Sequence, residues 1–560
     1  MAAALEWGPT VASLMGLTFA FSEFRIQYIK TKLSDKKAPP MPLPTLSDAV
    51  KNHARIRPHA LAIKDSSREL TYAAWDQRAT ALANGLAHMG LNKGDRVAVL
   101  AANGVEWMEI YAGLARAGLV VVPINFRLSP PEVAYILNDS GARCLLAQRE
   151  FANHLIESGL LAEFTYLALV ALFDSPPPMW RPYESLFHQP PAAQGLPVVH
   201  PSDTSALMYT SGTTGNPKGV IRSHQGSTLI AMATAVEMGF DASDRALIVM
   251  PLCHANSLYF SHTFAHLGAT CIIDDSRSFD AHKLLALLSS AQITFTSLVP
   301  THYIMMLGLA SDIKAQYNVA SVGKIMVSSA PVRKETKQAI LRFFHASALY
   351  ELYGSTEAGW VTLLRPHEQL DHLGSIGREW AYSAPVKVMD ADGNEVPDGE
   401  VGEIYSNTAY SFDGYWQLEE KTQQARRGDW CSVGDMGYRD AQGYLYLVDR
   451  KSNMIISGGE NIYPSEVEAV LSAHTSVRDV AVIGVPHEKW GETVHAFVVL
   501  HEGRHATADD LTAWCAKRLA RYKVPSHVGL IDAHEMPRNT TGKILHRVLR
   551  ERAQRAQAPA

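Results

Sequence analysis

Cysteine, long hydrophobic runs and net charge are all scarce in this chain. Its 560 residues include five cysteines, scattered from Cys144 to Cys515, which disfavours a disulfide framework and favours a reducing compartment such as the cytoplasm. The apolar stretch Val11–Phe21 has eleven residues, about half of what a membrane-spanning helix requires. A net charge of −5 provides no general attraction to nucleic acid, so any anion site must be built locally.

Residues 1–44 are predicted to form an N-terminal extension. Glu6 precedes the apolar stretch without any positive charge, unlike a secretory signal. Basic residues follow the stretch, so a helix here could associate weakly with a membrane surface. The alternative is a helix that packs on the body of the protein or on a partner. The proline-rich segment Pro39–Pro44 then predicts a stiff linker.

The main body predicts an α/β fold, because short apolar runs alternate with helical stretches from residue 96 to about residue 327. The composition, 47% hydrophobic and 19% charged, is that of a globular protein. We expect a large domain over 45–449, with two helix-covered sheets and, after Ser383, a distorted β-barrel. A small α+β domain would follow over 454–560.

The densest chemistry lies in the loop Met208–Val220, which is rich in glycine and hydroxyl groups and has one lysine. Glycines allow backbone N–H groups to approach an anion, while Lys218 adds a compact positive charge. The order Pro217-Lys218-Gly219 is not that of a Walker A loop. A simple surface turn between two strands is the alternative.

Three further islands are unusually polar. Glu351–Glu357 combines an aromatic ring, two hydroxyls and two carboxylates, which could hold a nucleotide and Mg²⁺, although a helix N-cap would need similar residues. Asp435 lies between glycines and could accept ribose hydroxyls, or belong to a simple turn. Lys543 lies in a loop near the C-terminus, where lysines are usually solvated.

Taken in order, the phosphate loop, Tyr353–Glu357, Gly434-Asp435, Asp449-Arg-Lys451 and Thr541-Gly-Lys543 resemble the adenylate-forming superfamily of acyl-CoA synthetases, luciferases and adenylation domains. The resemblance extends from about residue 70 to about residue 547. It implies that residues 450–453 form a hinge and that the small C-terminal domain is mobile.

The resemblance implies a role for each matching residue. Lys543 would bridge the substrate carboxylate and the α-phosphate of ATP, Thr356 would touch that phosphate, and Glu357 would help bind Mg²⁺. His254 would orient the carboxylate or gate the acyl pocket. The remaining nucleotide and CoA positions would be Thr210, Ser211, Gly212, Thr213, Thr214, Gly215, Lys218, Ser329, Ala330, Pro331, Glu351, Tyr353, Gly354, Ser355, Asp435, Arg450, Gly458 and Gly459.

The resemblance therefore implies an enzyme that uses ATP, Mg²⁺ and CoA to convert a carboxylic acid to an acyl-adenylate and then to a thioester. Apolar residues at 256–260 and 301–306 favour a hydrophobic acid, first a fatty acid. Aryl, cinnamate-like, terpenoid or steroid side-chain acids are alternatives, as is a carrier protein as acceptor. The oligomeric state is left open.

Two departures from the family pattern affect details. Ser452 and Asn453 stand where the hinge is commonly charged, and Val433 stands where the long-chain signature usually has threonine. Two other readings are weaker. A zinc site from Cys253, His254, His262 and His266 lacks a second pair with finger spacing. An inactive binding protein would not need to retain the charged motif residues.

Overall fold

The computed structural model describes residues 43–173, 175–210, 216–330, 332–457, 460–488, 490–538 and 542–557. The chain divides into one unit at 1–43 and another at 44–560. The predicted N-terminal helix, with its membrane association, lies outside the described residues. So do eight predicted site positions: Ser211, Gly212, Thr213, Thr214, Gly215, Pro331, Gly458 and Gly459.

One sheet has eight strands in the order β19-β9-β8-β4-β3-β5-β6-β7. Strands β3 to β7 run parallel, as the continuous apolar runs predict, whereas β8 and β9 form an antiparallel hairpin. The strands are β3 (Arg96–Leu100), β4 (Val120–Ile124), β5 (Cys144–Ala147), β6 (Ala168–Ala171), β7 (Arg181–Pro182), β8 (Thr204–Thr210), β9 (Lys218–Ser223) and β19 (Gly414–Tyr415).

The second sheet has thirteen strands in the order β17-β18-β22-β23-β16-β15-β14-β13-β12-β10-β11-β1-β2. Its parallel part comprises β1 (Leu61–Lys64), β10 (Arg245–Ile248), β11 (Thr270–Ile273), β12 (Phe295–Leu298), β13 (Lys324–Ser328) and β14 (Ala348–Ser355). Antiparallel strands continue it: β2 (Glu69–Thr71), β15 (Gly359–Leu364), β16 (Ser375–Glu379), β17 (Lys387–Met389), β18 (Gly402–Tyr405), β22 (Asp435–Arg439) and β23 (Leu445–Arg450). Most of the region predicted as barrel-like, namely β17, β18, β22 and β23, thus extends this sheet. Of its other strands, β19 joins the first sheet, and β20 (Arg426–Arg427) pairs with β21 (Trp430–Cys431). These described strands show no closed barrel.

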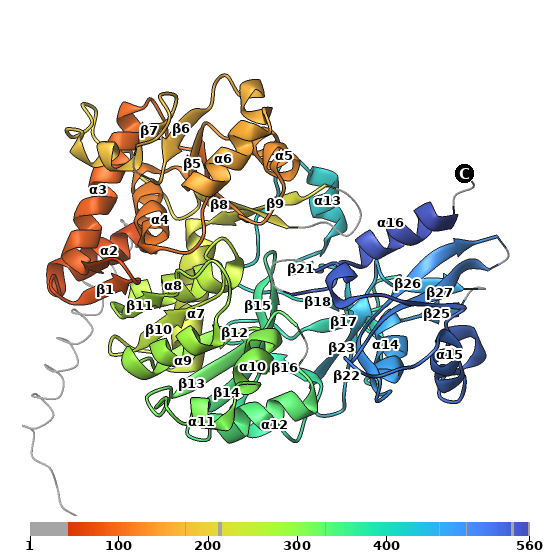
Figure 1. Cartoon of the computed structure of the whole chain (residues 1–560). Coiled ribbons are helices and arrows are strands. Elements are labelled where there is room, and N and C mark those ends of the chain that lie inside the picture. The colour runs from red at the N-terminus through yellow and green to blue at the C-terminus, as the bar shows by residue number, and fades with distance from the viewer. Residues whose placement is uncertain are drawn as a thin grey trace, which may run out of the picture. The chain divides into compact units, whose positions relative to one another are not determined.

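Helices cover both sheets (Figure 1). Their ends follow ordinary capping rules: Asp280 caps α9 through two backbone N–H groups, and Gly118 ends α4 in the left-handed conformation. None of the helices in the described ranges combines the length and the hydrophobicity needed to cross a bilayer. The helices are α2 (Leu46–Ile56), α3 (Tyr72–His88), α4 (Val105–Ala117), α5 (Pro130–Ser140), α6 (Arg149–Glu157), α7 (His224–Met238), α8 (Ala255–Leu267), α9 (Ala281–Ser290), α10 (Pro300–Leu307), α11 (Ser311–Lys314), α12 (Lys334–Phe343) and α13 (Glu419–Gln424).

The C-terminal region has its own α+β architecture and its own core (Figure 1, blue). Thr507 and Asp510 form a capping box at the start of α15, and Leu511 and Cys515 of this helix are fully buried. Its elements are β24 (Ile455–Ser457), β25 (Glu460–Ile462), α14 (Pro464–Ser472), β26 (Val477–His487), β27 (Gly491–Leu500), α15 (Ala508–Ala516), β28 (His527–Leu530) and α16 (His546–Gln557).

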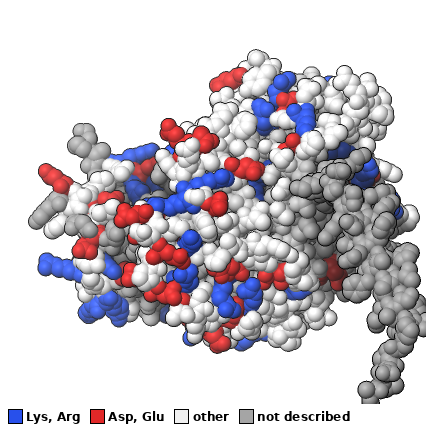
Figure 2. Space-filling view, turned by 180° about the vertical axis from the view of Figure 1, so that it is seen from behind, with Lys and Arg blue, Asp and Glu red and all other residues white. Residues whose placement is uncertain are grey.

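On the face shown in Figure 2, acidic and basic side chains are interspersed among uncharged ones. This mixture matches the small net charge of the chain.

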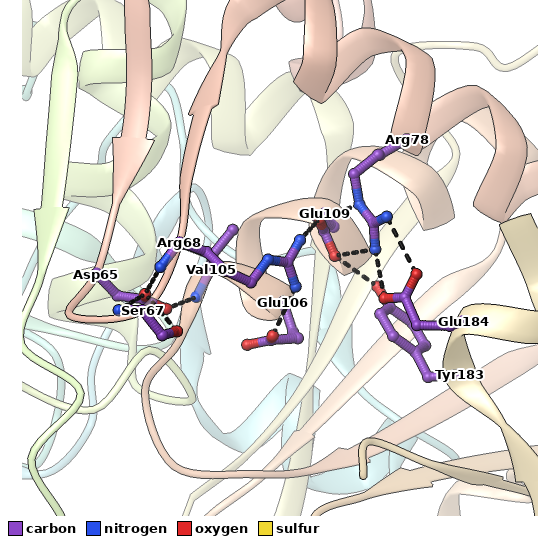
Figure 3. Close-up of polar contacts among 9 residues, drawn as sticks. All are labelled: Asp65, Ser67, Arg68, Arg78, Val105, Glu106, Glu109, Tyr183 and Glu184. Atoms are coloured by element: carbon purple, nitrogen blue, oxygen red, sulfur yellow. Dashed lines mark hydrogen bonds and ion pairs between the residues drawn. The ribbon is translucent and has the colours of Figure 1, made fainter. Parts of the chain in front are cut away.

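A buried carboxylate joins α3 and α4 (Figure 3). The side chain of Glu109 is completely buried and accepts hydrogen bonds from Arg68, Arg78 and the Tyr183 hydroxyl. Arg78 also pairs with Glu184. A carboxylate removed from water needs such partners, so this network ties four separate segments together.

Four histidines lie on or near α8: His224 and His262 are buried, whereas His254 and His266 are partly buried. Among the described residues, no group of three His, Cys, Asp or Glu side chains forms a metal site. Burial lowers the pKa of His262 to about 3 and that of His224 to about 4, and it also lowers the pKa of His266. Burial likewise lowers the pKa of His254 to about 4. These side chains are therefore neutral in the folded protein at pH 7.

We expect Glu109→Gln to lower the free energy of unfolding by about 3 kcal/mol, because it leaves two arginines short of their counter-charge. Urea unfolding would measure it. The control is Glu69→Gln, which removes an exposed pair with Lys64 and should cost about 0.5 kcal/mol or less. Equal losses in both variants would contradict a structural role for the network.

Acid should destabilise the protein below about pH 6.5, because these histidines bind protons in the unfolded chain at that pH but stay neutral in the folded protein. For each such histidine, the free energy of unfolding falls by up to about 1.4 kcal/mol per pH unit until the pH reaches the pKa of that histidine in the folded protein. His262→Phe, which keeps a ring against Tyr111, should reduce the loss of stability between pH 6.5 and pH 5. Urea midpoints across this range test it, with exposed His59→Phe as control; an unchanged slope would contradict it.

Candidate functional site

The predicted phosphate loop joins β8 to β9. Thr210 and Lys218 face each other as the last register pair of this hairpin, so both ends of the loop are held together. The Lys218 ammonium lies 4.0 Å from the centre of the Tyr415 ring. Burial lowers the pKa of Lys218, while the nearby Glu357 carboxylate opposes the shift. An anion bound beside Lys218 would therefore stabilise its ammonium charge, which burial disfavours.

Thr356 and Glu357 occupy the turn between β14 and β15. No helix starts here, so the alternative of a helix N-cap is wrong. The Glu357 side chain is buried, and its Oε1 atom accepts a 2.9 Å hydrogen bond from the Tyr415 hydroxyl. Gly354 is required at the base of the turn, because a Cβ atom there would overlap the carbonyl oxygen of Gly359. In the same turn, the Ser355 hydroxyl accepts from the backbone N–H of Ala358 at 2.9 Å.

The buried guanidinium of Arg222 holds the same turn from the side of β9. It donates to the carbonyl oxygens of Glu357 at 3.1 Å and Tyr410 at 2.6 Å, with a longer contact of 3.4 Å to Thr356. The strand that follows the phosphate loop is thereby fastened to the turn that carries Glu357.

Asp435 and Arg450 are register partners on β22 and β23. Their side chains form an ion pair at 2.9 Å, and the Tyr353 hydroxyl donates to the second oxygen of Asp435 at 2.7 Å. Three predicted nucleotide residues, up to 97 positions apart in the sequence, are thus in direct contact. Asp435 is buried, so these two partners also satisfy its charge.

A cavity of about 400 Å³ lies beside this cluster and is lined by Lys543 as well. Burial, together with the nearby Arg450 cation, lowers the pKa of Lys543 to about 8. Most of this lysine is still protonated at pH 7. The predicted site residues that line the cavity are Ser329, Ala330, Glu351, Tyr353, Gly354, Asp435, Arg450 and Lys543.

Two of these lining residues have structural features that their motifs did not indicate. Ser329 adopts a left-handed φ of 70°, a strained conformation of the kind found at binding sites. Glu351 forms a buried ion pair with Lys337 at 2.7 Å. The carboxylate of Glu351 therefore already has a counter-charge from α12.

His254 precedes α8 as its N-cap residue and does not line this cavity. Because it is neutral, it can offer a carboxylate a hydrogen bond but not a charge. The neighbouring Tyr259 and Phe260 are buried against Trp360, whereas Ile304 and Met305 on α10 are 54% and 48% exposed. The expected acyl region is thus apolar, and the contacts it makes with the acid stay a prediction.

The predicted hinge directly follows β23. Asn453 donates to a carboxylate oxygen of Asp449 at 3.2 Å, and the other oxygen accepts from the backbone N–H of Ser465 at 2.9 Å. Asp449 therefore links the end of β23 to the start of α14. The exact domain boundaries and the hinge stay predictions.

Sequence reasoning missed Tyr415, Arg222 and Lys337. Tyr415 lies 58 positions from Glu357, and Arg222 lies 135 positions from it. No local spacing rule connects such pairs. The signal in the sequence was indirect: a glycine before Tyr415, and an arginine directly after the apolar pair Val220-Ile221.

The fit to the expected ligands is good. A buried carboxylate with one oxygen facing a tyrosine donor suits Mg²⁺ held through few protein oxygens. A cavity lined by Tyr353, Asp435, Arg450 and Lys543 offers an aromatic ring, an acceptor and two cations, as a nucleotide requires.

Characterised proteins are similar to this chain over nearly its whole length. A fatty acid–[acyl-carrier-protein] ligase of Streptomyces coeruleorubidus is 34% identical over 91% of this chain and 96% of its own. A feruloyl-CoA synthase of an Amycolatopsis species is 36% identical over 89% and 97%. A long-chain-fatty-acid–CoA ligase of Mycobacterium tuberculosis is 35% identical over 90% and 97%.

Solved structures show the same fold. An anthranilate CoA ligase in complex with anthranoyl-AMP has a TM-score of 0.81 at 27% identity, covering 94% of this chain and all of its own. The O-succinylbenzoate CoA synthetase of Bacillus subtilis, bound to ATP and magnesium, has a TM-score of 0.78 at 28% identity, covering 90% and 99%.

Residues 50–416 match the family described as AMP-binding enzyme, and residues 466–543 match its C-terminal domain. The chain belongs to the AMP-binding enzyme family.

Proposed function

We propose that this chain is an AMP-forming ligase that joins a hydrophobic carboxylic acid to CoA, with a fatty acid as the first choice. The observation that carries the proposal is the cavity that combines Tyr353, Asp435 and Arg450 with Lys543. ATP, Mg²⁺ and CoA are the reactants and cofactor of this family. The five free, buried cysteines agree with a reducing compartment.

A carboxylate is a poor acyl donor until its oxygen becomes part of a good leaving group. In the first half-reaction, a carboxylate oxygen attacks the α-phosphorus of ATP, and the bond to pyrophosphate breaks. Lys543 would neutralise charge at the α-phosphate and the incoming carboxylate. Glu357 would hold Mg²⁺, which supplies positive charge to the polyphosphate. The Lys218 ammonium would pair with the same phosphates.

In the second half-reaction, the CoA thiolate attacks the acyl carbon, and AMP leaves with the electron pair of the broken C–O bond. Asp435 and Arg450 would hold the ribose through both steps, and Tyr353 would lie beside the adenine. In the family that the chain resembles, the small domain rotates between the two half-reactions and withdraws the terminal lysine, so Lys543 would not act in this step. The two half-reactions should therefore respond differently to the loss of Lys543.

A different acid and a different acceptor also have specific support. A feruloyl-CoA synthase and an anthranilate CoA ligase among the similar proteins favour an aryl acid as second candidate. The fatty acid–[acyl-carrier-protein] ligase favours a carrier protein as alternative acceptor. A hydrophobic acid is common to the fatty-acid and aryl readings, since the expected acyl region is apolar.

A panel of fatty and aryl acids, assayed for ATP-dependent thioester formation with and without CoA, tests the proposal. We expect acyl-CoA from at least one fatty acid, with AMP and pyrophosphate formed in equal amounts. If adenylate accumulates while CoA stays unreacted, the acceptor is a carrier protein. If no acid in the panel releases pyrophosphate, the ligase proposal is wrong.

Lys543→Ala should slow acyl-adenylate formation by about a hundredfold, because one preorganised cation at the developing charge is lost. Transfer from preformed acyl-adenylate to CoA should change little. Pyrophosphate exchange and single-turnover thioester formation measure the two steps. Lys523→Ala, which removes an ion pair with Glu466 elsewhere in the C-terminal region, is the matched control. Equal slowing of both steps would contradict the role of Lys543.

A further inference from the structure

Tyr415 contacts two predicted ATP-binding groups at once. Its hydroxyl donates a 2.9 Å hydrogen bond to Oε1 of Glu357, and its ring lies 4.0 Å from the Lys218 ammonium. The hydroxyl and the ring face are separate parts of one side chain, so each contact can be removed independently. No residue motif of the sequence pointed to this tyrosine.

The tyrosine is itself firmly held. Its side chain is 5% exposed, and its ring packs edge to face on Phe412 with centroids 5.0 Å apart. Its backbone forms β19 against Val220 of β9, and its N–H donates to the Thr422 hydroxyl at 2.9 Å. A rigid side chain with a fixed backbone can hold other groups in place.

The other hydrogen bonds of Glu357 among the described residues are made by its backbone. Arg222 holds its carbonyl oxygen, and its own carbonyl also accepts from the N–H of Phe412 at 2.7 Å. Neither contact restrains the carboxylate. The described residues provide that carboxylate with a hydrogen-bond donor in the Tyr415 hydroxyl. Burial raises the pKa of Tyr415, and the negative charge of Glu357 raises it further, so the hydroxyl stays protonated and can donate.

Lys218 is restrained in a similar way. It is half-buried at the end of the phosphate loop, and its ammonium is attracted by the Tyr415 ring face. A cation over an aromatic face loses fewer alternative positions when an anion arrives than a lysine that moves freely in water. The ring thus prepares the lysine for a phosphate.

We propose that Tyr415 is a positioning residue for MgATP: its hydroxyl orients the Glu357 carboxylate for the metal ion, and its ring orients the Lys218 ammonium for the phosphates. This inference rests on the proposed function, in which Glu357 and Lys218 meet Mg²⁺ and ATP. Tyr415 touches neither ligand in this account and acts through its two neighbours.

Two substitutions separate the contacts. Tyr415→Phe keeps the ring and removes the hydrogen bond, so the Mg²⁺ concentration needed for half-maximal ATP binding should rise about tenfold. ATP affinity at saturating Mg²⁺ should stay within about twofold of the unmodified protein. Tyr415→Leu removes the ring as well, and ATP affinity should then fall several-fold even at saturating Mg²⁺. Isothermal titration calorimetry of ATP at a series of Mg²⁺ concentrations, without any acid or CoA, measures both effects.

Tyr410→Phe is the matched control. It removes an equally buried hydroxyl, which donates to the Trp360 carbonyl at 2.9 Å, from the same stretch of chain. Its Mg²⁺ dependence should equal that of the unmodified protein. Thermal unfolding of both Phe variants without ligand reports any general loss of structure.

The outcomes are distinct. If the unmodified protein binds no MgATP, the proposed function fails. If it binds MgATP and Tyr415→Phe shows an unchanged Mg²⁺ dependence, the positioning role fails while the function stands. If Tyr415→Phe and Tyr410→Phe raise the Mg²⁺ concentration needed for half-maximal ATP binding by the same factor, the effect is general destabilisation and the inference is overturned.

Discussion

A charge removed from water must find a partner, and in this protein the partners lie far apart in the chain. Asp435 is buried against Arg450 and Tyr353, Glu357 against Tyr415, and Glu351 against Lys337. An unpaired buried carboxylate would be strongly destabilising. These pairings therefore constrain how the two large sheets pack together, and they fix the β14–β15 turn relative to β19 and the pair β22–β23 relative to β14.

The same pairings leave the site ready for anions. Lys218 and Lys543 are both partly withdrawn from water, and the pKa of each is lowered by burial. Neither reaches full compensation from the nearby carboxylates, so each would gain from a phosphate. Arg222 adds mechanical support, since it links the strand that carries Lys218 to the turn that carries Glu357. The predicted phosphate-binding strand and the predicted metal-binding turn are thus parts of one connected structure.

Much of the fold was predictable, because the patterns involved are local. The alternation of apolar runs and helical stretches between residue 96 and about residue 327 predicted helix-covered parallel strands, and the structure has them. Apolar runs flanking the phosphate loop correctly predicted the β8–β9 pair. The helix N-cap, which was the alternative for Ser355, is wrong, because whether a helix follows depends on what the chain does next in space. A short-range pattern does not encode that.

By itself, the sequence determined the element types, the family motifs and the chemical character of the candidate groups, since these depend on neighbouring residues and on side-chain chemistry. Only the tertiary structure decided which groups meet: Tyr353 with Asp435, Glu351 with Lys337, and Tyr415 with both Glu357 and Lys218. The physical reason is that these contacts join strands and turns separated by 14 to about 200 residues. Their geometry follows from sheet register and from the pairing of buried charges, neither of which is visible in any one motif.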